Sequence, residues 1–241
     1  MTSANHAGHV FTGGSGLLGR ALRALRPDAL FPSSAEFDVT NYSQMQDWAH
    51  SRNLRVVVHA AAFISPPKID KDPVRALDVN IVGTANVVRL CAALGARLVY
   101  ISTDYVFRGD RGLYAEGDEV HPVNKYAWSK LGGECAVRLY DKGLIIRTSF
   151  GPETFPYEKA FADQWTSRQA VSLAARDILR AVDSDCLGVL HIGGPRTTVL
   201  EYARGLDPAR TIQPLSVNDV PFAVPKDTSL DTTRFIREVA D

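Results

Sequence analysis

Short runs of consecutive apolar residues alternate with helix-like segments along the first 149 residues of this 241-residue chain. We expect strands over 9–12, 29–32, 55–62, 97–102 and 143–149. The segments between them, 16–26, 39–52, 72–95 and 125–140, space their apolar residues as helices do. Strands that are apolar on both faces and alternate with helices are typical of a parallel sheet covered on both sides. The sequence therefore predicts a doubly wound α/β fold.

A glycine-rich segment, TGGSGLLG, joins the first predicted strand to the first helix at 12–19. Three glycines spaced three apart can give a tight turn, a close approach to a pyrophosphate and close helix packing, as in Rossmann-type domains. The free N–H groups of the helix start would face the phosphates. A tight turn without a ligand is the less favoured alternative, given the position between strand and helix. We expect dinucleotide contacts from Gly13, Ser15, Gly16, Leu17 and Leu18.

The end of the second predicted strand, LFPSSAEFDV, bears on the type of dinucleotide. An NAD site favours an acid there, which accepts from the ribose 2′-hydroxyl. Ser33 and Ser34 occupy that place, Glu36 falls just beyond it, and the segment has no Arg. We therefore favour NADP(H), with NAD(H) as the alternative, and expect Asp38 and Val39 beside the adenine.

A Tyr and a Lys four residues apart, in YAWSK, share one face of the helix that follows the fourth strand. That strand runs into STDYVF, so its terminal hydroxyls, Thr103 and Ser102, point to the same end of the sheet. The alternative is a solvated helix pair. Reduction of a carbonyl needs a proton donor, and an ammonium about 4 Å from Tyr126 supplies the roughly 4 kcal/mol that lowers its pKa by about three units. We expect Lys130 to be that ammonium and Thr103 to polarise the carbonyl.

The segments TGGSGLLG, HAAAF, ISTDYVF and PVNKYAWSKLGGE together resemble extended short-chain dehydrogenase/reductases, and in particular the dTDP-4-dehydrorhamnose reductase group. The resemblance implies an NADP(H)-dependent reductase of a 4-keto nucleotide-sugar, with Thr103, Tyr126 and Lys130 as catalytic residues. It also implies that Ala60, Ala61, Ala62, Asn80 and Ser102 line or brace the cofactor cleft. A related NADP-binding regulatory subunit of methionine adenosyltransferase is the non-enzymatic alternative.

The chain departs from this group on the substrate side. Related reductases carry an extra helix between residues matching Ser149 and Asp163, and related dehydratases carry Glu where this chain has Tyr105. A nucleotide-sugar carries a pyrophosphate that needs cationic or amide donors, for which Arg168, Arg196 and Lys226 are candidates. The expected substrate contacts are Thr103, Asp104, Tyr105, Phe107, Phe150, Trp165, Arg168 and Lys226.

After residue 149 the helix and strand pattern loosens. We expect 150–169 to be mainly loop, then a helix over 171–182 and a last strand over 188–194. The dinucleotide-binding domain would span 1–149. Residues 150–241 would complete the sheet and add a small substrate lobe to the same unit, with most of the aromatic residues of 150–165 forming its core.

Lys plus Arg and Asp plus Glu balance at 27 each, which gives no sign of nucleic-acid or membrane-surface binding. We see no apolar run long enough to cross a bilayer. Three dispersed cysteines favour free thiols in the cytoplasm. The histidines, including His6 and His9, show no metal-ligand spacing, so we expect no metal. Pairing through helices 73–94 and 125–140 is common in the family, which makes a homodimer the expected assembly.

Overall fold

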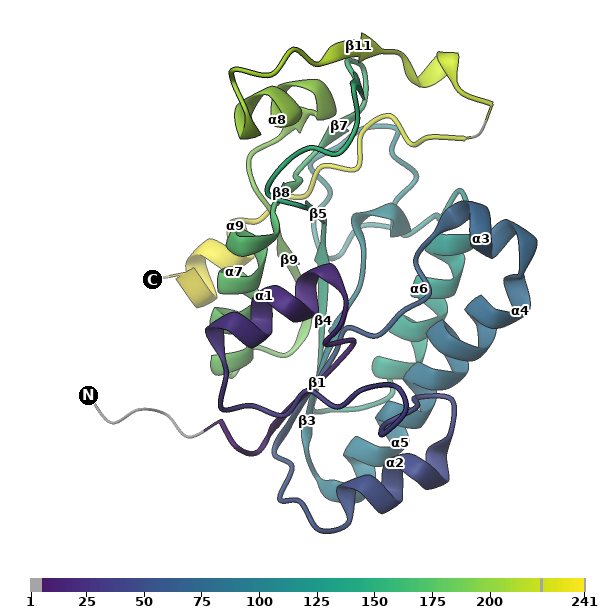
Figure 1. The fold of residues 1–241 in the computed structure, drawn as a ribbon, viewed down its shortest axis with the longest axis vertical. Coiled ribbons are helices and arrows are strands. Elements are labelled where there is room, and N and C mark those ends of the chain that lie inside the picture. Colours follow the sequence, from purple (N-terminus) through teal and green to yellow (C-terminus); the bar gives the residue numbers. More distant parts are fainter. Residues whose placement is uncertain (1–5, 222, 241) are drawn as a thin grey trace.

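A parallel sheet of five strands organises the protein, in the order β1-β2-β3-β4-β9 (Figure 1). The computed structural model describes residues 6–221 and 223–240. The strands are β1 His9–Thr12, β2 Val56–His59, β3 Arg97–Ile101, β4 Gly143–Thr148 and β9 Gly188–Ile192. Their inner positions are almost wholly buried, as expected for strands covered on both faces.

Helices cover both faces of the sheet (Figure 1), which confirms the predicted doubly wound fold. On one face Leu18 and Leu22 of α1 pack with Ile178 of α7. On the other, Met45 of α2 and Leu90 of α5 form a second core. The bounds are α1 Leu17–Leu25, α2 Tyr42–Ala49, α3 Pro66–Lys71, α4 Pro73–Ala76, α5 Gly83–Leu94, α6 Lys125–Val137, α7 Val171–Asp183, α8 Val199–Leu206 and α9 Thr233–Phe235, which continues as a π-helical turn over Ile236–Ala240.

The long helix predicted over 72–95 is helical throughout but changes type midway. A π-helical segment, Leu77–Val82, separates α4 from α5. Pro73 occupies the first turn, and Gly95 ends the helix in the left-handed region with φ 67°. By length and composition alone, Pro73–Leu94 could cross a membrane, contrary to our expectation. In this fold its apolar residues Leu90 and Cys91 pack in the core between helix and sheet.

The second predicted strand, 29–32, is reduced to a single bridge between Leu30 and Val10. Leu30 exchanges backbone hydrogen bonds with His9 and Phe11, and the pairing stops at Pro32, which has no N–H to donate. Leu30 thus lies on one side of β1 and β2 on the other. This is a point where the strand order reverses, and open α/β sheets bind ligands in the crevice at such points.

The predicted loop over 150–169 contains four short strands instead. Three two-stranded pairs build the small lobe, β5 with β8, β6 with β11, and β7 with β10. Phe155 and Ala160 pack with Val199 and Leu200 of α8, so an aromatic residue of this segment does form part of the lobe's core. The lobe lies beyond the ends of β4 and β9 (Figure 1). Its strands are β5 Phe150–Gly151, β6 Lys159–Phe161, β7 Trp165–Thr166, β8 Gln169–Ala170, β10 Thr197–Thr198 and β11 Gln213–Leu215.

Candidate active site

A cavity of about 1690 Å³ opens at the carboxyl ends of β1, β2, β3 and β4. It runs from the glycine turn to the base of the small lobe, so residues from distant parts of the chain share one space. The structure brings most of the predicted site residues to its walls, namely Gly13, Ser15, Gly16, Leu17, Leu18, Ser33, Ser34, Asp38, Val39, Ala60, Ala61, Ala62, Ser102, Thr103, Asp104, Tyr105, Tyr126, Lys130, Phe150 and Arg168.

The three glycines of the turn have different surroundings. Gly13 has φ 74°, which favours glycine, and a Cβ there would lie 2.7 Å from the backbone nitrogen of Ala61. A Cβ on Gly19 would lie 2.2 Å from the carbonyl oxygen of Gly13. A Cβ on Gly16 would meet only that same carbonyl, at 3.3 Å. The fold therefore requires Gly13 and Gly19, whereas a side chain at Gly16 would press on one carbonyl oxygen and otherwise extend into the cavity, where a pyrophosphate could approach closely.

Tyr126 and Lys130 reach the cavity from the first turns of α6. Asn124 caps this helix by accepting from the backbone nitrogen of Ala127 at 2.9 Å. Thr103 enters from the other side, just after β3, where it caps a short 3₁₀ turn. The cap fixes the start of α6, so the tyrosine and the lysine four residues later face the cavity that Thr103 also lines.

The pKa of the tyrosine differs from our expectation. Burial raises the pKa of Tyr126 to about 12, and the negative charge of Asp104 acts in the same direction, although a hydrogen bond with Thr103 opposes both. Burial also lowers the pKa of Lys130 to about 7. Desolvation therefore outweighs the expected effect of a nearby ammonium on the tyrosine. Tyr126 holds its proton firmly near neutral pH.

Lys130 lies on a buried polar layer between α6 and the sheet. Its Nζ sits 4.1 Å from the centre of the Tyr100 ring. One helical turn further, Glu134 forms an ion pair of 2.8 Å with Arg147, and both side chains have 0% exposure. Ser102 donates to Glu134 at 2.5 Å. The carboxylate of Glu134 raises the pKa of Lys130 and thereby partly offsets its burial.

Asn80 braces the cavity from behind and does not line it. It lies in the π-helical segment, accepts from the backbone nitrogen of Phe63 at 2.7 Å, and donates to the carbonyl of Phe63 and the hydroxyl of Ser129. Ser129 in turn donates to the carbonyl oxygen of Tyr126. This chain of hydrogen bonds ties the segment after β2 to the helix that carries the tyrosine.

Asp104 is a buried acid next to Thr103. Burial raises the pKa of Asp104 to about 6, although Thr228 donates to its carboxylate at 2.6 Å. Asp104 is therefore mostly ionised near neutral pH and takes up a proton in mildly acidic solution, and it lines the same cavity.

Three predicted substrate residues do not line the cavity. Phe107 is fully buried, stacked on Tyr114 at 4.3 Å, because the 3₁₀ turn directs its ring into the core. Trp165 lies in β7 under the guanidinium of Arg196, which itself pairs with Asp227. Lys226 is exposed and accepts a backbone hydrogen bond from Trp165.

A second, smaller cavity of about 160 Å³ adjoins the first within the lobe. Tyr105, Ser149 and Arg168 line both cavities. The Nε of Arg168 is buried and has no hydrogen-bond partner among the described residues. The remaining walls of the small cavity are rich in aromatic and polar side chains, including Phe155, Tyr157, Lys159, Phe161 and Gln164.

Arg23 and Thr148 are among the residues of the large cavity that sequence reasoning missed. The Oγ1 of Thr148 is buried without a partner in the described part of the chain. Arg23 lies four residues after Gly19, and helical spacing puts Gly16, Gly19 and Arg23 on one face of α1. That spacing could have indicated from the sequence that Arg23 lies on the same side of α1 as the glycine turn.

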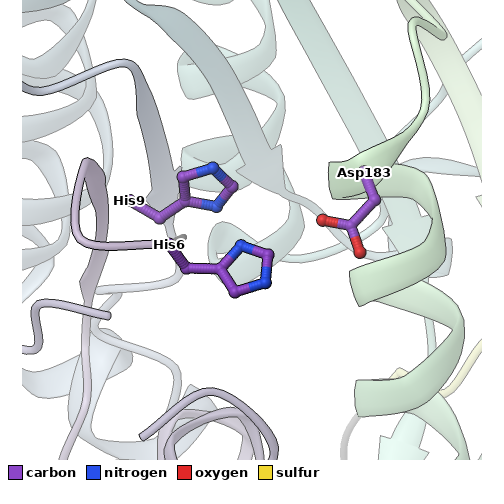
Figure 2. Close-up of side chains that lie close together, drawn as sticks. All are labelled: His6, His9 and Asp183. Carbon is purple, nitrogen blue, oxygen red and sulfur yellow. The ribbon is translucent and has the colours of Figure 1, made fainter. Parts of the chain in front are cut away.

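His6, His9 and Asp183 form a separate cluster whose ligand atoms all lie within 4.8 Å of one another (Figure 2). Two imidazoles and a carboxylate are a set that a transition metal can use. However, the guanidinium of Arg26 already contacts both His6 and Asp183. A cation thus occupies this position, and the cluster ties the start of β1 to the end of α7.

Comparison with known proteins places the chain in one family. Residues 9–176 match the model of the RmlD substrate binding domain. The chain is 31% identical to the dTDP-4-dehydrorhamnose reductase of Mycobacterium tuberculosis, over 90% of this chain and 82% of that protein. A Mycolicibacterium smegmatis protein of the same name is 40% identical, over 58% of this chain and only 45% of its own length.

Other comparisons point to the same fold. The crystal structure of a dTDP-4-dehydrorhamnose reductase from Bacillus anthracis in complex with NADP is 27% identical, with a TM-score of 0.85 over 95% of this chain and 90% of that one. The methionine adenosyltransferase 2 subunit beta of Rattus norvegicus is 26% identical over 93% of this chain and 80% of that protein. The family match covers well over half of the sequence, and the chain therefore belongs to the RmlD substrate binding domain family, as its resemblance to dTDP-4-dehydrorhamnose reductases predicted.

Proposed function

We propose that this protein is an NADP(H)-dependent reductase of a 4-keto nucleotide-sugar. The observation that carries the proposal is the convergence of Thr103, Tyr126 and Lys130 on the cavity that also contains the glycine turn. The similarity to dTDP-4-dehydrorhamnose reductases, and to one solved with NADP, supports both the reaction and the cofactor.

The cavity fits a nicotinamide dinucleotide. Gly16 leaves open space beside the N-terminus of α1, where backbone N–H groups can meet a pyrophosphate. At the other end, the buried Oγ1 of Thr148 has no hydrogen-bond partner among the described residues and could bond to the reactive part of the ligand. A bound NADPH supplies the hydride.

The protein's own residues supply the proton and stabilise the growing charge. Tyr126 is protonated near neutral pH because its pKa is about 12, so it can donate to the carbonyl oxygen as that oxygen becomes negative. The hydroxyl of Thr103 is placed at the same wall to stabilise that oxygen by a hydrogen bond. Burial lowers the pKa of Lys130 to about 7, so it is only partly charged in the resting site near neutral pH. A tyrosinate forming in the same cavity would favour the ammonium form of Lys130, which would then stabilise that negative charge.

Arg168 is the substrate-binding residue that the geometry supports best. It lines both cavities, and its Nε has no hydrogen-bond partner in residues 6–221 and 223–240, so the diphosphate of a nucleotide-sugar could bind there. The sugar would then extend toward Thr103 and Tyr126, and the nucleoside toward the aromatic lobe cavity. The 160 Å³ volume of that cavity suits part of such a ligand.

A homodimer in the cytoplasm is the assembly that we propose. Helix α6 exposes Trp128, and Leu139 just beyond it is 87% exposed. Leu77 in the adjoining helical stretch is also exposed, so this side of the protein carries apolar side chains that pairing would cover. The three cysteines are free, as is usual in a reducing compartment.

The decisive experiment is NADPH oxidation measured against a panel of nucleotide-linked 4-keto sugars. Turnover of at least one of them establishes the reductase. A protein that binds NADP(H) tightly but reduces none of these sugars would instead match the regulatory alternative. The similarity to the methionine adenosyltransferase 2 subunit beta supports that alternative.

A further inference from the structure

We propose that Arg23 recognises the phosphate on the adenosine ribose and is the residue that makes this chain prefer NADP(H) over NAD(H). This inference rests on the proposed function, since it concerns the same cofactor cavity. The segment 30–39 contains no arginine. The fold supplies one from α1 instead.

The guanidinium of Arg23 has a fixed position. Its Cζ lies 4.7 Å from the centre of the Phe31 ring, and one of its nitrogens donates to the carbonyl of Phe31 at 3.2 Å. Phe31 is itself stacked on the buried ring of Phe11 at 4.8 Å. Arg23 is therefore held against a rigid platform, which reduces the entropy lost when it binds an anion.

The guanidinium of Arg23 lies where the glycine turn meets the end of the second strand segment, the two parts of the chain that form a ribose site in this fold. A Cβ built on Gly14 would lie 3.1 Å from the Nη2 of Arg23 and 3.2 Å from the Cβ of Phe31. The arginine thus lies between the glycine turn and Phe31, and Ser33 and Ser34 line the same cavity. In dinucleotide sites of this fold, an arginine near this strand end accommodates a 2′-phosphate.

The positive charge and most of the N–H donors of Arg23 remain available for a ligand. Within residues 6–221 and 223–240, it forms no ion pair with a carboxylate. Its hydrogen bond to Phe31 uses one of the five N–H donors of a guanidinium. A phosphate oxygen pair matches the remaining planar fork.

Glu36 is the acid that would favour NAD(H), and it is engaged elsewhere. Its Oε2 accepts from the backbone nitrogen of Ser33 at 2.9 Å and from the Ser33 hydroxyl at 2.8 Å. These hydrogen bonds lower the pKa of Glu36 and fold its carboxylate back on its own turn. Glu36 therefore stabilises its own turn, which leaves Arg23 as the charged side chain available to the adenosine ribose.

Calorimetric titration of the purified protein with NADP⁺ and with NAD⁺ tests the proposal without any turnover. We expect the wild-type protein to bind NADP⁺ more tightly. Arg23→Met should weaken NADP⁺ binding by about tenfold or more, the range for a charge-assisted contact, and change NAD⁺ binding less than about twofold. Arg23→Lys, which keeps the charge but not the planar fork, should fall between the two.

Arg89→Met is the matched control. Arg89 also stacks on an aromatic ring, with its Cζ 4.1 Å from the centre of Tyr42, but it does not line the cavity. We expect it to bind both dinucleotides as the wild type does. Added salt should weaken wild-type binding of NADP⁺ more than that of NAD⁺, a difference that Arg23→Met should remove.

Equal weakening of both dinucleotides by Arg23→Met, or no weakening of either, would overturn the proposal. So would NAD⁺ preference in the wild type that Glu36→Gln abolishes, since Glu36 would then be the ribose acid. A wild-type protein that binds neither dinucleotide would refute the proposed function itself, so the two failures can be told apart.

Discussion

The carboxylate of Glu134 and the guanidinium of Arg147 pair at 2.8 Å with no solvent exposure, one helical turn beyond Lys130. Ser102, at the end of β3, donates to the same carboxylate. The pair thus joins α6, β3 and β4 immediately behind Lys130 and Thr103, two of the proposed catalytic residues. It gives the tyrosine helix a fixed relation to the sheet.

Glu134→Gln should reduce the free energy of unfolding by about 3–5 kcal/mol, because it leaves the Arg147 charge buried without its counter-ion. Urea unfolding at neutral pH measures this. Asp177→Asn is the control, since it breaks the partly exposed pair with Arg180 and should cost at most about 1 kcal/mol. A similar small loss in both variants would show that the buried pair does not stabilise the site.

Gly16→Val should abolish dinucleotide binding and leave the fold intact. A Cβ at Gly16 meets only the carbonyl of Gly13 at 3.3 Å, so the added side chain fills the cavity and not the core. Gly19→Ala should do the reverse and destabilise the fold by about 1–3 kcal/mol, since its Cβ would clash with backbone. Calorimetric titration measures the loss of dinucleotide binding, and thermal unfolding measures the loss of stability. If folded Gly16→Val binds the dinucleotide as tightly as the wild type, the pyrophosphate does not bind at this turn.

Tyr126→Phe should lower turnover by about two to four orders of magnitude, because it removes the transferable proton and keeps the ring. Dinucleotide binding should stay close to that of the wild type. Tyr42→Phe, on α2 away from the cavity, should leave both unchanged. If the native protein reduces no keto-sugar, and Tyr126→Phe keeps its biological role, the protein acts as a regulatory subunit.

The stability of the ligand-free protein should rise between pH 7 and 9 because of Lys130. Burial lowers its pKa from 10.5 to about 7, so in this window the unfolded chain holds a proton that the folded protein has released. Unfolding then takes up a proton, and the free energy of unfolding increases with pH, by about 2 kcal/mol across the window. Urea midpoints at pH 7, 8 and 9 measure the rise. Lys130→Met should flatten it, and an equal rise in that variant would assign it to another group.

Trp128→Glu combined with Leu139→Glu should convert the proposed dimer to a monomer. Both side chains are exposed on the α6 side of the protein, and buried carboxylates would oppose an apolar interface. Light scattering after size-exclusion chromatography reports the mass. Leu173→Glu, an exposed leucine of α7 on the opposite layer, is the control. A monomeric wild type, or a double variant that still dimerises, would place any pairing elsewhere.

Regular elements with strong local signals could be predicted from the sequence. Asn41 caps α2, Pro73 starts α4 and Gly95 ends α5, each because one residue type suits that backbone position. The cavity walls contributed by strand ends could also be predicted, since the ends of parallel strands converge. Tyr126 and Thr103 thus come together although they are distant in sequence.

Features that depend on tertiary environment could not be predicted. The π-helical segment at Asn80 depends on side-chain hydrogen bonds to Phe63 and Ser129. The pairing of β6 with β11 joins short segments whose sequence periodicity is too brief to detect. The pKa of Tyr126 follows its burial, which spacing on a helix does not reveal. An aromatic residue such as Phe107 can either contact a substrate or pack in the core, and only the tertiary structure shows that Phe107 packs in the core.

The hydrogen bond from Thr228 to Asp104 joins residues 124 positions apart. The last of the five sheet strands ends at Ile192, so all five are synthesised before Thr228 is added. A nascent chain can therefore hold the Rossmann sheet while the acid beside Thr103 still lacks its donor. A chain that ends before Thr228 would keep the glycine turn, but Asp104 would lack the hydrogen bond that holds its carboxylate beside Thr103.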